Sequence, residues 1–306
     1  MAESLGQPLA NTNNTSNGTS NKVEHPAERK RRCGFVLTPV KRAPARIPAA
    51  AEIVAVPSGA HRALPLPQAV LDRLGDPRII VGFDCETHDW LDNAERKGRI
   101  GQFGWYTKND DVHFSRIVQL GWVVAGPGNS RELVSKSSLI QPCGFQMSAR
   151  ATKCHGITHE AAMENGRALA DVLEEFVRDA SEACARGGRV CAHQLEFDAG
   201  LIDEELRRCG LPDLRKTWQQ IARAGYCTMN PAVGRWLKEC SGEDVGPETT
   251  KPIVGLTKTM RLLGLCPDSL QQRHHDAEHD ARMAQLIYAT LLNHARKDSS
   301  ALAEAG

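Results

Sequence analysis

The chain of 306 residues lacks long hydrophobic runs, and no stretch reaches the length of about 18 apolar residues that a membrane-spanning helix requires. Its first residues also lack the apolar segment of a secretory signal peptide. Ten cysteines are present, but none forms a CxxC pair or a Cys/His cluster with zinc-site spacing. These absences predict an intracellular protein with free thiols, and argue against a membrane protein or a disulfide framework.

The chain also has little net charge, because its formal charge is only +1. The charge is uneven, since residues 1–46 carry eight Lys and Arg against three Glu, which leaves −4 for the remainder. We expect residues 1–75 to form a basic, disordered tail and linker, because they are poor in large apolar side chains. The run at 29–32 (RKRR) favours the nucleus over the cytoplasm or contacts nucleic-acid backbone, although a solvated basic tract explains it as well.

From residue 76 onward, β-forming runs and helical patterns alternate, which indicates one α/β domain over residues 76–297. Residues 298–306 are expected to be a disordered C-terminus. The apolar runs predict three early strands, then two short ones among helices, with a last amphipathic helix at 276–296. The predicted strands are 78–87, 116–126, 131–142, 188–194 and 226–229, and the other predicted helices are 168–187, 197–208, 231–240 and 256–263.

Two acidic residues stand on the first predicted strand. Asp84 and Glu86 are two positions apart, so their side chains leave the same face of an otherwise apolar strand. Burying two carboxylates there is costly unless a cation or hydrogen-bond donors hold them. A strand that simply ends at these acids, leaving both solvated, is the alternative.

Two further aspartates stand near the starts of later helices. Asp198 follows the short apolar run 190–192, and an acid in the first turn of a helix is favourable without any catalytic role. Asp280 lies close to the apolar stripe of the last helix, where a solvated helix start explains it less well. His275 directly precedes this helix, five residues before Asp280, and is expected in a loop.

These segments resemble the three exonuclease motifs of the DnaQ-like DEDDh superfamily. The matching sequences are FDCET (83–87), AHQLEFD (192–198) and HDAEHDA (275–281), in the order that the family shows, with a similar HGIT segment at 155–158. The resemblance covers residues 78–296 and implies a ribonuclease H-like α/β fold. Its sheet would be five-stranded and mixed, with three antiparallel strands followed by two parallel ones, flanked by helices.

The resemblance implies a metal-dependent 3′–5′ exonuclease that releases nucleoside 5′-monophosphates from DNA or RNA ends. Two Mg²⁺ or Mn²⁺ ions would be bound by Asp84, Glu86, Asp198 and Asp280, and all-carboxylate ligation suits such hard cations. His275 would accept the proton of the attacking water. Weaker candidates for substrate contact are Thr87, His88, His155, His193 and Phe197. Several relatives are dimers, so a homodimer is one possible state.

Two departures from the family pattern bear on this reading. Gln194 stands where the family often has Asn. An insertion over residues 89–114 interleaves aromatic and basic residues, which suits stacking on unpaired bases, although a small packed flap is the alternative. Other ribonuclease H-like nucleases, such as an endonuclease or an integrase, and an inactive nucleic-acid-binding module are the competing functions.

Overall fold

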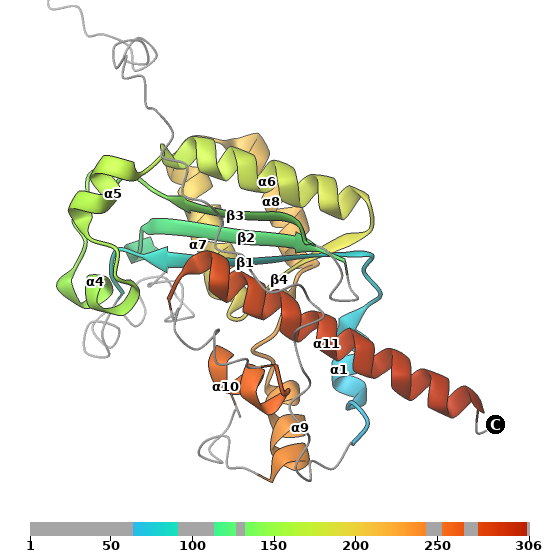
Figure 1. Cartoon of the computed structure of the whole chain (residues 1–306). Helices are drawn as coiled ribbons and strands as arrows, with labels where there is room; N and C mark the ends of the chain where they lie inside the picture. The colour runs from blue at the N-terminus through green and yellow to red at the C-terminus, as the bar shows by residue number, and fades with distance from the viewer. Residues whose placement is uncertain (1–63, 91–112, 127–131, 243–252, 266–274, 305–306) are drawn as a thin grey trace, which may run out of the picture. The chain divides into compact units, whose positions relative to one another are not determined.

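The computed structural model describes residues 64–90, 113–126, 132–242, 253–265 and 275–304 (Figure 1). Five strands form one sheet in the order β3-β2-β1-β4-β5. The pairs β1–β2 and β2–β3 are antiparallel, and the pairs β1–β4 and β4–β5 are parallel. The predicted five-stranded mixed sheet is therefore confirmed. The strands are β1 (Ile79–Thr87), β2 (Ile117–Ala125), β3 (Glu132–Leu139), β4 (Gly188–Ala192) and β5 (Tyr226–Cys227).

The central strands are covered on both faces. Every residue of β2 is buried, and in β1 only Asp84 is more than slightly exposed. Strands buried on both faces read as continuous apolar runs, which is why the sequence locates them well. The edge strand β3 is largely exposed over its first six residues, and the sequence there is correspondingly polar.

One face of the sheet packs against α6 (Leu169–Ala185), α7 (Leu195–Arg208) and α8 (Pro212–Arg223). Figure 1 shows these three helices together on one side of the sheet. Four aromatic rings fill this layer, and their centroids lie 5.2–5.5 Å apart in the contacting pairs. Such large buried rings dominate core energetics. They are Phe83, Trp122, Phe176 and Trp218.

The other face packs against α11 (Ala277–Glu304), the long helix that crosses the sheet in Figure 1. With it lie α1 (Gln68–Leu74), α9 (Pro231–Ser241) and α10 (Leu256–Leu262). The backbone of α11 approaches the sheet at two glycines. A Cβ on Gly82 would lie 2.2 Å from the carbonyl oxygen of Ala281, and one on Gly121 would lie 2.1 Å from the amide nitrogen of Glu278. Only glycine at both positions allows this close approach.

Two short helices, α4 (Ala149–His155) and α5 (His159–Asn165), connect β3 to α6. Ser148 caps α4 and Thr158 caps α5 through side-chain oxygens that accept backbone N–H groups. Gly156 ends α4 with φ 74°, a left-handed conformation that glycine adopts at little cost. The HGIT segment is thus a turn between two helices.

Several elements differ from the sequence expectations. Helix α1 lies within the segment expected to be a linker, yet Val70 and Leu74 are buried against α9 and α11. The start of the domain at residue 76 is therefore too late, because apolar residues at helical spacing bring the preceding turn into the core. At the other end, α11 continues to Glu304, beyond the end expected at 297. Helices α1, α4, α5 and α8 were not predicted.

Other expectations fall on residues outside the described ranges. These are the basic tail up to residue 63 and most of the insertion, residues 91–112. Within the described ranges, no helix combines the length and the apolar character needed to cross a membrane.

Candidate metal centre

The four predicted acids come from three places in the fold. Asp84 and Glu86 stand on β1, Asp198 stands in the first turn of α7 directly after β4, and Asp280 stands in the first turn of α11. Because β1 and β4 are parallel neighbours, their carboxyl ends meet at one edge of the sheet. The first turn of α11 lies over the middle of β2, close to the same edge.

Three of the predicted side chains meet closely. One possible ligand atom from each of Glu86, His275 and Asp280 lies within 4.8 Å of the others. Glu86 is buried, whereas His275 is exposed to solvent. His275 has φ 62°, which makes it the one non-glycine residue with positive φ in the described part of the chain. Such strained backbone concentrates at functional sites, where the surrounding structure holds it in place.

Asp198 lies deeper, and its side chain is only 4% exposed. Its carboxylate accepts the backbone N–H of Cys85, the residue between Asp84 and Glu86, and also its own backbone N–H. These bonds fix the start of α7 against the end of β1. The two acids of β1 and the acid of α7 are therefore held by one local arrangement.

Burial and mutual repulsion raise the pKa of all four carboxyl groups. Burial raises the pKa of Glu86 to about 8, and the charge of Asp280 adds to the effect. Burial also raises the pKa of Asp198 to about 7, with Asp280 again adding to it, and that of Asp280 to about 7, where Asp276 adds to it. The pKa of Asp84 lies well above its usual value because of burial first and the charge of Asp198 second.

The described part of the chain supplies no cation that offsets these acids. Within the described ranges, no Arg or Lys forms an ion pair with any of the four carboxylates. The Oδ1 atom of Asp280 is buried and has no hydrogen-bond partner there. A buried oxygen without a partner and four clustered carboxylates are unfavourable until a positive charge enters. The donor set therefore fits a divalent cation, and oxygen ligands suit Mg²⁺ or Mn²⁺.

Contacts with β2 fix the start of α11, and with it the position of Asp280. The backbone N–H of Ala277 donates to Oε1 of Gln119, at 3.1 Å. The Asp276 carboxylate accepts the N–H of His279 at 3.2 Å, which caps the helix. Neither Gln119 nor Asp276 stood out in the sequence. The signal that could have indicated Asp276 as a helix cap is its place just before an apolar helical pattern, where Ser, Thr and Asp commonly cap helices.

Two of the weaker candidates lie beside this centre. The carbonyl oxygen of Thr87, the last residue of β1, lies 3.2 Å from Nε2 of His155. Nδ1 of His155 accepts the N–H of Ile157 at 3.0 Å, so Nε2 carries the proton and donates to Thr87. Burial lowers the pKa of His155, and the nearby His275 contributes to the shift. The HGIT segment thus borders the acids.

The other candidates have structural partners. Nδ1 of His88 accepts the N–H of Arg116 at 3.1 Å, and burial lowers the pKa of His88 to about 4. His193 lies 2.9 Å from both the Thr228 hydroxyl and the Val254 carbonyl, and burial lowers its pKa to about 4. Phe197 is partly buried against the core between the sheet and α6–α8. Contact of these three residues with a substrate stays a prediction.

Gln194, where the family often has Asn, is the N-cap residue of α7. Its carbonyl oxygen accepts the N–H groups of Phe197 and Asp198, at 2.8 and 3.2 Å. Its side chain makes no capping hydrogen bond, and the residue lines a cavity of about 480 Å³ beside β5. The backbone of Gln194 therefore positions Asp198, whatever its amide contacts.

Comparison with known proteins gives matches in structure alone. No family model matches the chain, and no curated protein matches it in sequence. Similar folds include Escherichia coli exonuclease I in complex with a dT13 oligonucleotide, with a TM-score of 0.53 and 12% identity over 73% of this chain. A second E. coli exonuclease I structure has a TM-score of 0.52 and 11% identity over 70% of this chain.

The chain spans 43% and 41% of the length of these two exonuclease I chains. Exonuclease I belongs to the DnaQ-like DEDDh 3′–5′ exonucleases. At such low identity the likeness shows the fold alone. The chain therefore has the ribonuclease H-like fold of these exonucleases, as the motifs predicted.

Proposed function

We propose that this protein is a divalent-metal-dependent 3′–5′ exonuclease of the DEDDh type. It acts on single-stranded DNA or RNA ends and releases nucleoside 5′-monophosphates. The observation that carries the proposal is the meeting of Glu86, His275 and Asp280 within 4.8 Å in a group of acids that no Arg or Lys of the described ranges pairs with. The fold shared with exonuclease I supports it.

Asp84, Glu86, Asp198 and Asp280 would hold two Mg²⁺ or Mn²⁺ ions. When bound, such a pair of cations lowers the pKa of water and stabilises the charge on the leaving 3′-oxygen. The chain's own part is to hold the four carboxylates in place and ionised. The N–H of Cys85 holds Asp198 and favours its ionised form, and the hydrogen bond from Ala277 to Gln119 fixes the position of Asp280.

His275 would take the proton of the attacking water. An imidazole suits this task because its ordinary pKa lies near neutral pH. Its side chain is exposed to solvent, so the proton can pass to bulk water after the step. Two features hold His275 next to the acids. Its backbone has a positive φ, and its backbone N–H donates a hydrogen bond to the Asp280 carboxylate. A His275→Ala variant should therefore bind metal but cleave far more slowly.

The test is a gel assay with 5′-labelled single-stranded DNA and RNA of matched sequence, in Mg²⁺, Mn²⁺ or EDTA. We expect a metal-dependent ladder that shortens from the 3′ end, and a cleavage rate about 10²–10³-fold lower in Asp280→Asn. Asp171→Asn is the matched control, because Asp171 is also a first-turn aspartate but is exposed on α6, outside the site. It should cleave as the wild type does.

Full activity in Asp280→Asn would contradict the proposal. Binding of oligonucleotides with no cleavage in either metal, by a folded protein, would instead support the inactive binding module. The preferred sugar follows from which of the two strands is shortened faster. Size-exclusion chromatography with light scattering of the same sample tests whether the protein is a homodimer.

A further inference from the structure

A second buried carboxylate lies behind the candidate metal centre. Glu205 on α7 is fully buried, with 0% of its side chain exposed. It follows Asp198 by seven residues, about two helical turns, so both side chains leave the same face of α7. Its Oε1 accepts the backbone N–H of Ile117, which pairs with Thr87 at the end of β1. Glu205 is therefore close behind β1.

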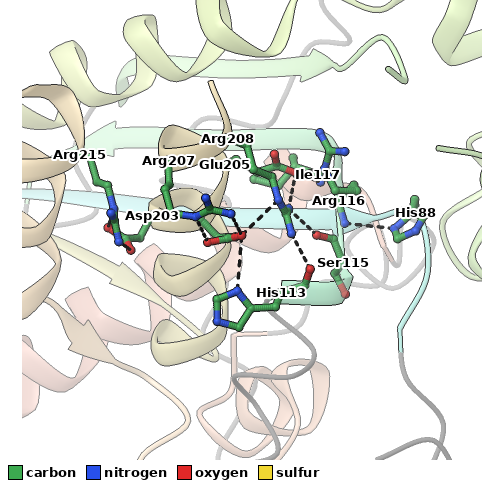
Figure 2. Close-up of polar contacts among 11 residues, drawn as sticks. His88, His113, Ser115, Arg116, Ile117, Asp203, Glu205, Arg207, Arg208 and Arg215 are labelled. Atoms are coloured by element: carbon green, nitrogen blue, oxygen red, sulfur yellow. Dashed lines mark hydrogen bonds and ion pairs between the residues drawn. The ribbon is translucent and has the colours of Figure 1, made fainter. Parts of the chain in front are cut away.

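One oxygen of Glu205 makes all of its described contacts. Oε1 accepts from Nε of Arg116 at 2.7 Å and from the backbone N–H of Ile117 at 3.2 Å, and it lies 3.2 Å from Nη1 of Arg208 (Figure 2). Oε2 is buried and has no partner within the described ranges. A buried ion pair of this kind adds little net stability compared with apolar packing. Its geometry, rather than its energy, is informative.

The contact with Ile117 connects α7 to the end of β1. Ile117 is the first residue of β2 and pairs with Thr87, and the register of the two strands shifts between Glu86 and Thr87. Glu205 thus binds the β2 residue that lies opposite Thr87, one position after Glu86. The next residue of the pairing, Gln119, holds the start of α11.

The two arginines extend this connection to the segment before β2. Arg208 donates to the carbonyl oxygens of Ser115 and His113, at 3.0 and 2.5 Å. The backbone of Arg116 exchanges two hydrogen bonds with His88, one with its amide at 2.9 Å and one with its ring at 3.1 Å. Figure 2 shows Arg116, Ser115 and Glu205 converging between α7 and His88. Through Ile117 and Arg116, this carboxylate therefore links the helix that bears Asp198 to the end of the strand that bears Glu86.

We infer that Glu205 is a positioning residue of the metal centre, which sets the place of Asp198 relative to Glu86 by binding Ile117, Arg116 and Arg208. The inference rests on the proposed function, because it concerns the same site. Residues that orient metal ligands in this way typically change metal affinity about 10–100-fold when they are altered.

The test compares two neighbouring glutamates in the full chain. Glu205→Gln keeps the size of the side chain but removes its charge. Glu204→Gln is the matched control, because the Glu204 side chain is also almost buried and ion-paired, but with Arg207, Arg208 and His113 instead of the start of β2. Mn²⁺ affinity is measured without substrate, by loss of the electron paramagnetic resonance signal of free Mn²⁺.

We expect the dissociation constant for Mn²⁺ to rise about tenfold or more in Glu205→Gln and to change less than about twofold in Glu204→Gln. The Mn²⁺ concentration for half-maximal cleavage should rise in parallel, while the KM for the oligonucleotide at saturating Mn²⁺ stays that of the wild type. A merely structural role would lower the melting temperature of both variants without this difference in metal affinity.

An unchanged Mn²⁺ dissociation constant in folded Glu205→Gln overturns the inference and leaves the proposed function intact. Absence of Mn²⁺ binding by the wild type overturns both. If Glu205→Gln does not fold, Arg116→Gln takes its place, because it removes the shortest contact of Glu205 and leaves the carboxylate paired with Arg208. The same increase is expected there, and an unchanged constant again overturns the inference.

Discussion

The burial of individual carboxyl groups explains why the proposed metal site favours a cation. The Born cost of burying a carboxylate is large, and neighbouring negative charges increase it. Glu86, Asp198 and Asp280 respond with pKa values raised to about 8, 7 and 7. Without metal, part of this cost is relieved by protonation near neutral pH. With metal, the cation replaces the protons.

The raised pKa values predict a pH-dependent stability of the metal-free protein. Between the unfolded pKa, about 4, and the folded pKa, 7 to 8, the folded state binds more protons than the unfolded state, so stability falls as pH rises through 7 to 8. His88 and His193 have lowered pKa values, about 4, so their effect is complete once pH exceeds about 6.5. Of these groups, only the carboxylates therefore change the stability with pH above pH 6.5.

The measurement is the melting temperature in EDTA at pH 6.5 and pH 8, for the wild type and for Asp280→Asn. We expect the wild type to lose stability over this range and Asp280→Asn to lose less, because one repelling charge is absent. Mg²⁺ at 100 times its dissociation constant should add about 2.7 kcal/mol to the wild type at pH 8. Equal slopes for both proteins would mean that Asp280 does not titrate in this range.

Among the elements, α11 decides whether Asp280 reaches the other acids. Its buried face carries Ala277, Ala281 and Ala284, and it lies against two glycines of the sheet. Small side chains on both sides bring the helix axis close to β1 and β2. A larger residue on either side would move the start of the helix outward, together with Asp280.

Gly121→Ala tests this packing. Its Cβ would lie 2.1 Å from the Glu278 amide nitrogen and 2.2 Å from the Ala277 carbonyl carbon, both of them backbone atoms that cannot rotate away. We expect a loss of about 1–3 kcal/mol in the free energy of unfolding, and a rate loss on the order of 10²-fold from a displacement of about 1 Å. Gly255→Ala is the control, because its Cβ would meet no atom within 4 Å.

Thermal melts and the rate of mononucleotide release measure both effects. Gly255→Ala should stay within about 0.5 kcal/mol of the wild type. If Gly121→Ala behaves like Gly255→Ala, the start of α11 does not depend on the close approach at Gly121.

At the scale of the whole molecule, the folded unit begins before the first acidic motif. None of the acidic motifs lies before residue 76, yet Leu66, Val70 and Leu74 are no more than 5% exposed. The Leu64 carbonyl also accepts from Nε1 of Trp236 at 3.1 Å, and the Leu66 N–H donates to Asp298 at the same distance. The segment from 64 to 74 therefore belongs with α9 and α11.

Two deletions test the contributions of the basic tail and of this segment to stability separately. Removal of residues 1–60 should leave the melting temperature and exonuclease rate unchanged, because none of the motifs or described core residues lies there. Removal of residues 1–75 should cost several kcal/mol, since three buried apolar side chains contribute about 1.5–3 kcal/mol each. Circular dichroism melts and the gel assay of both proteins measure this. Equal stability of the two deletions would show that α1 does not contribute to the core.

The sequence alone determined the properties that depend on neighbouring positions along the chain. The apolar runs of β1 and β2 indicated strands, because both faces of these strands are buried. The spacing of Asp84 and Glu86 placed both on one face, and the order of the three motifs indicated the fold. The sequence also indicated Asp198, Asp280 and His275, since these residues belong to the same motifs.

Only the tertiary structure decided what depends on residues distant in the chain. It showed that α1 is part of the core, and that His88 and His193 have buried hydrogen-bond partners. It also placed Glu205 against Ile117, 88 positions earlier in the chain. No local pattern distinguishes Glu205 from Glu204, because the two face different partners only after α7 packs against the sheet. Local sequence therefore indicates the strands, helices and motifs, whereas tertiary packing determines which distant side chains meet.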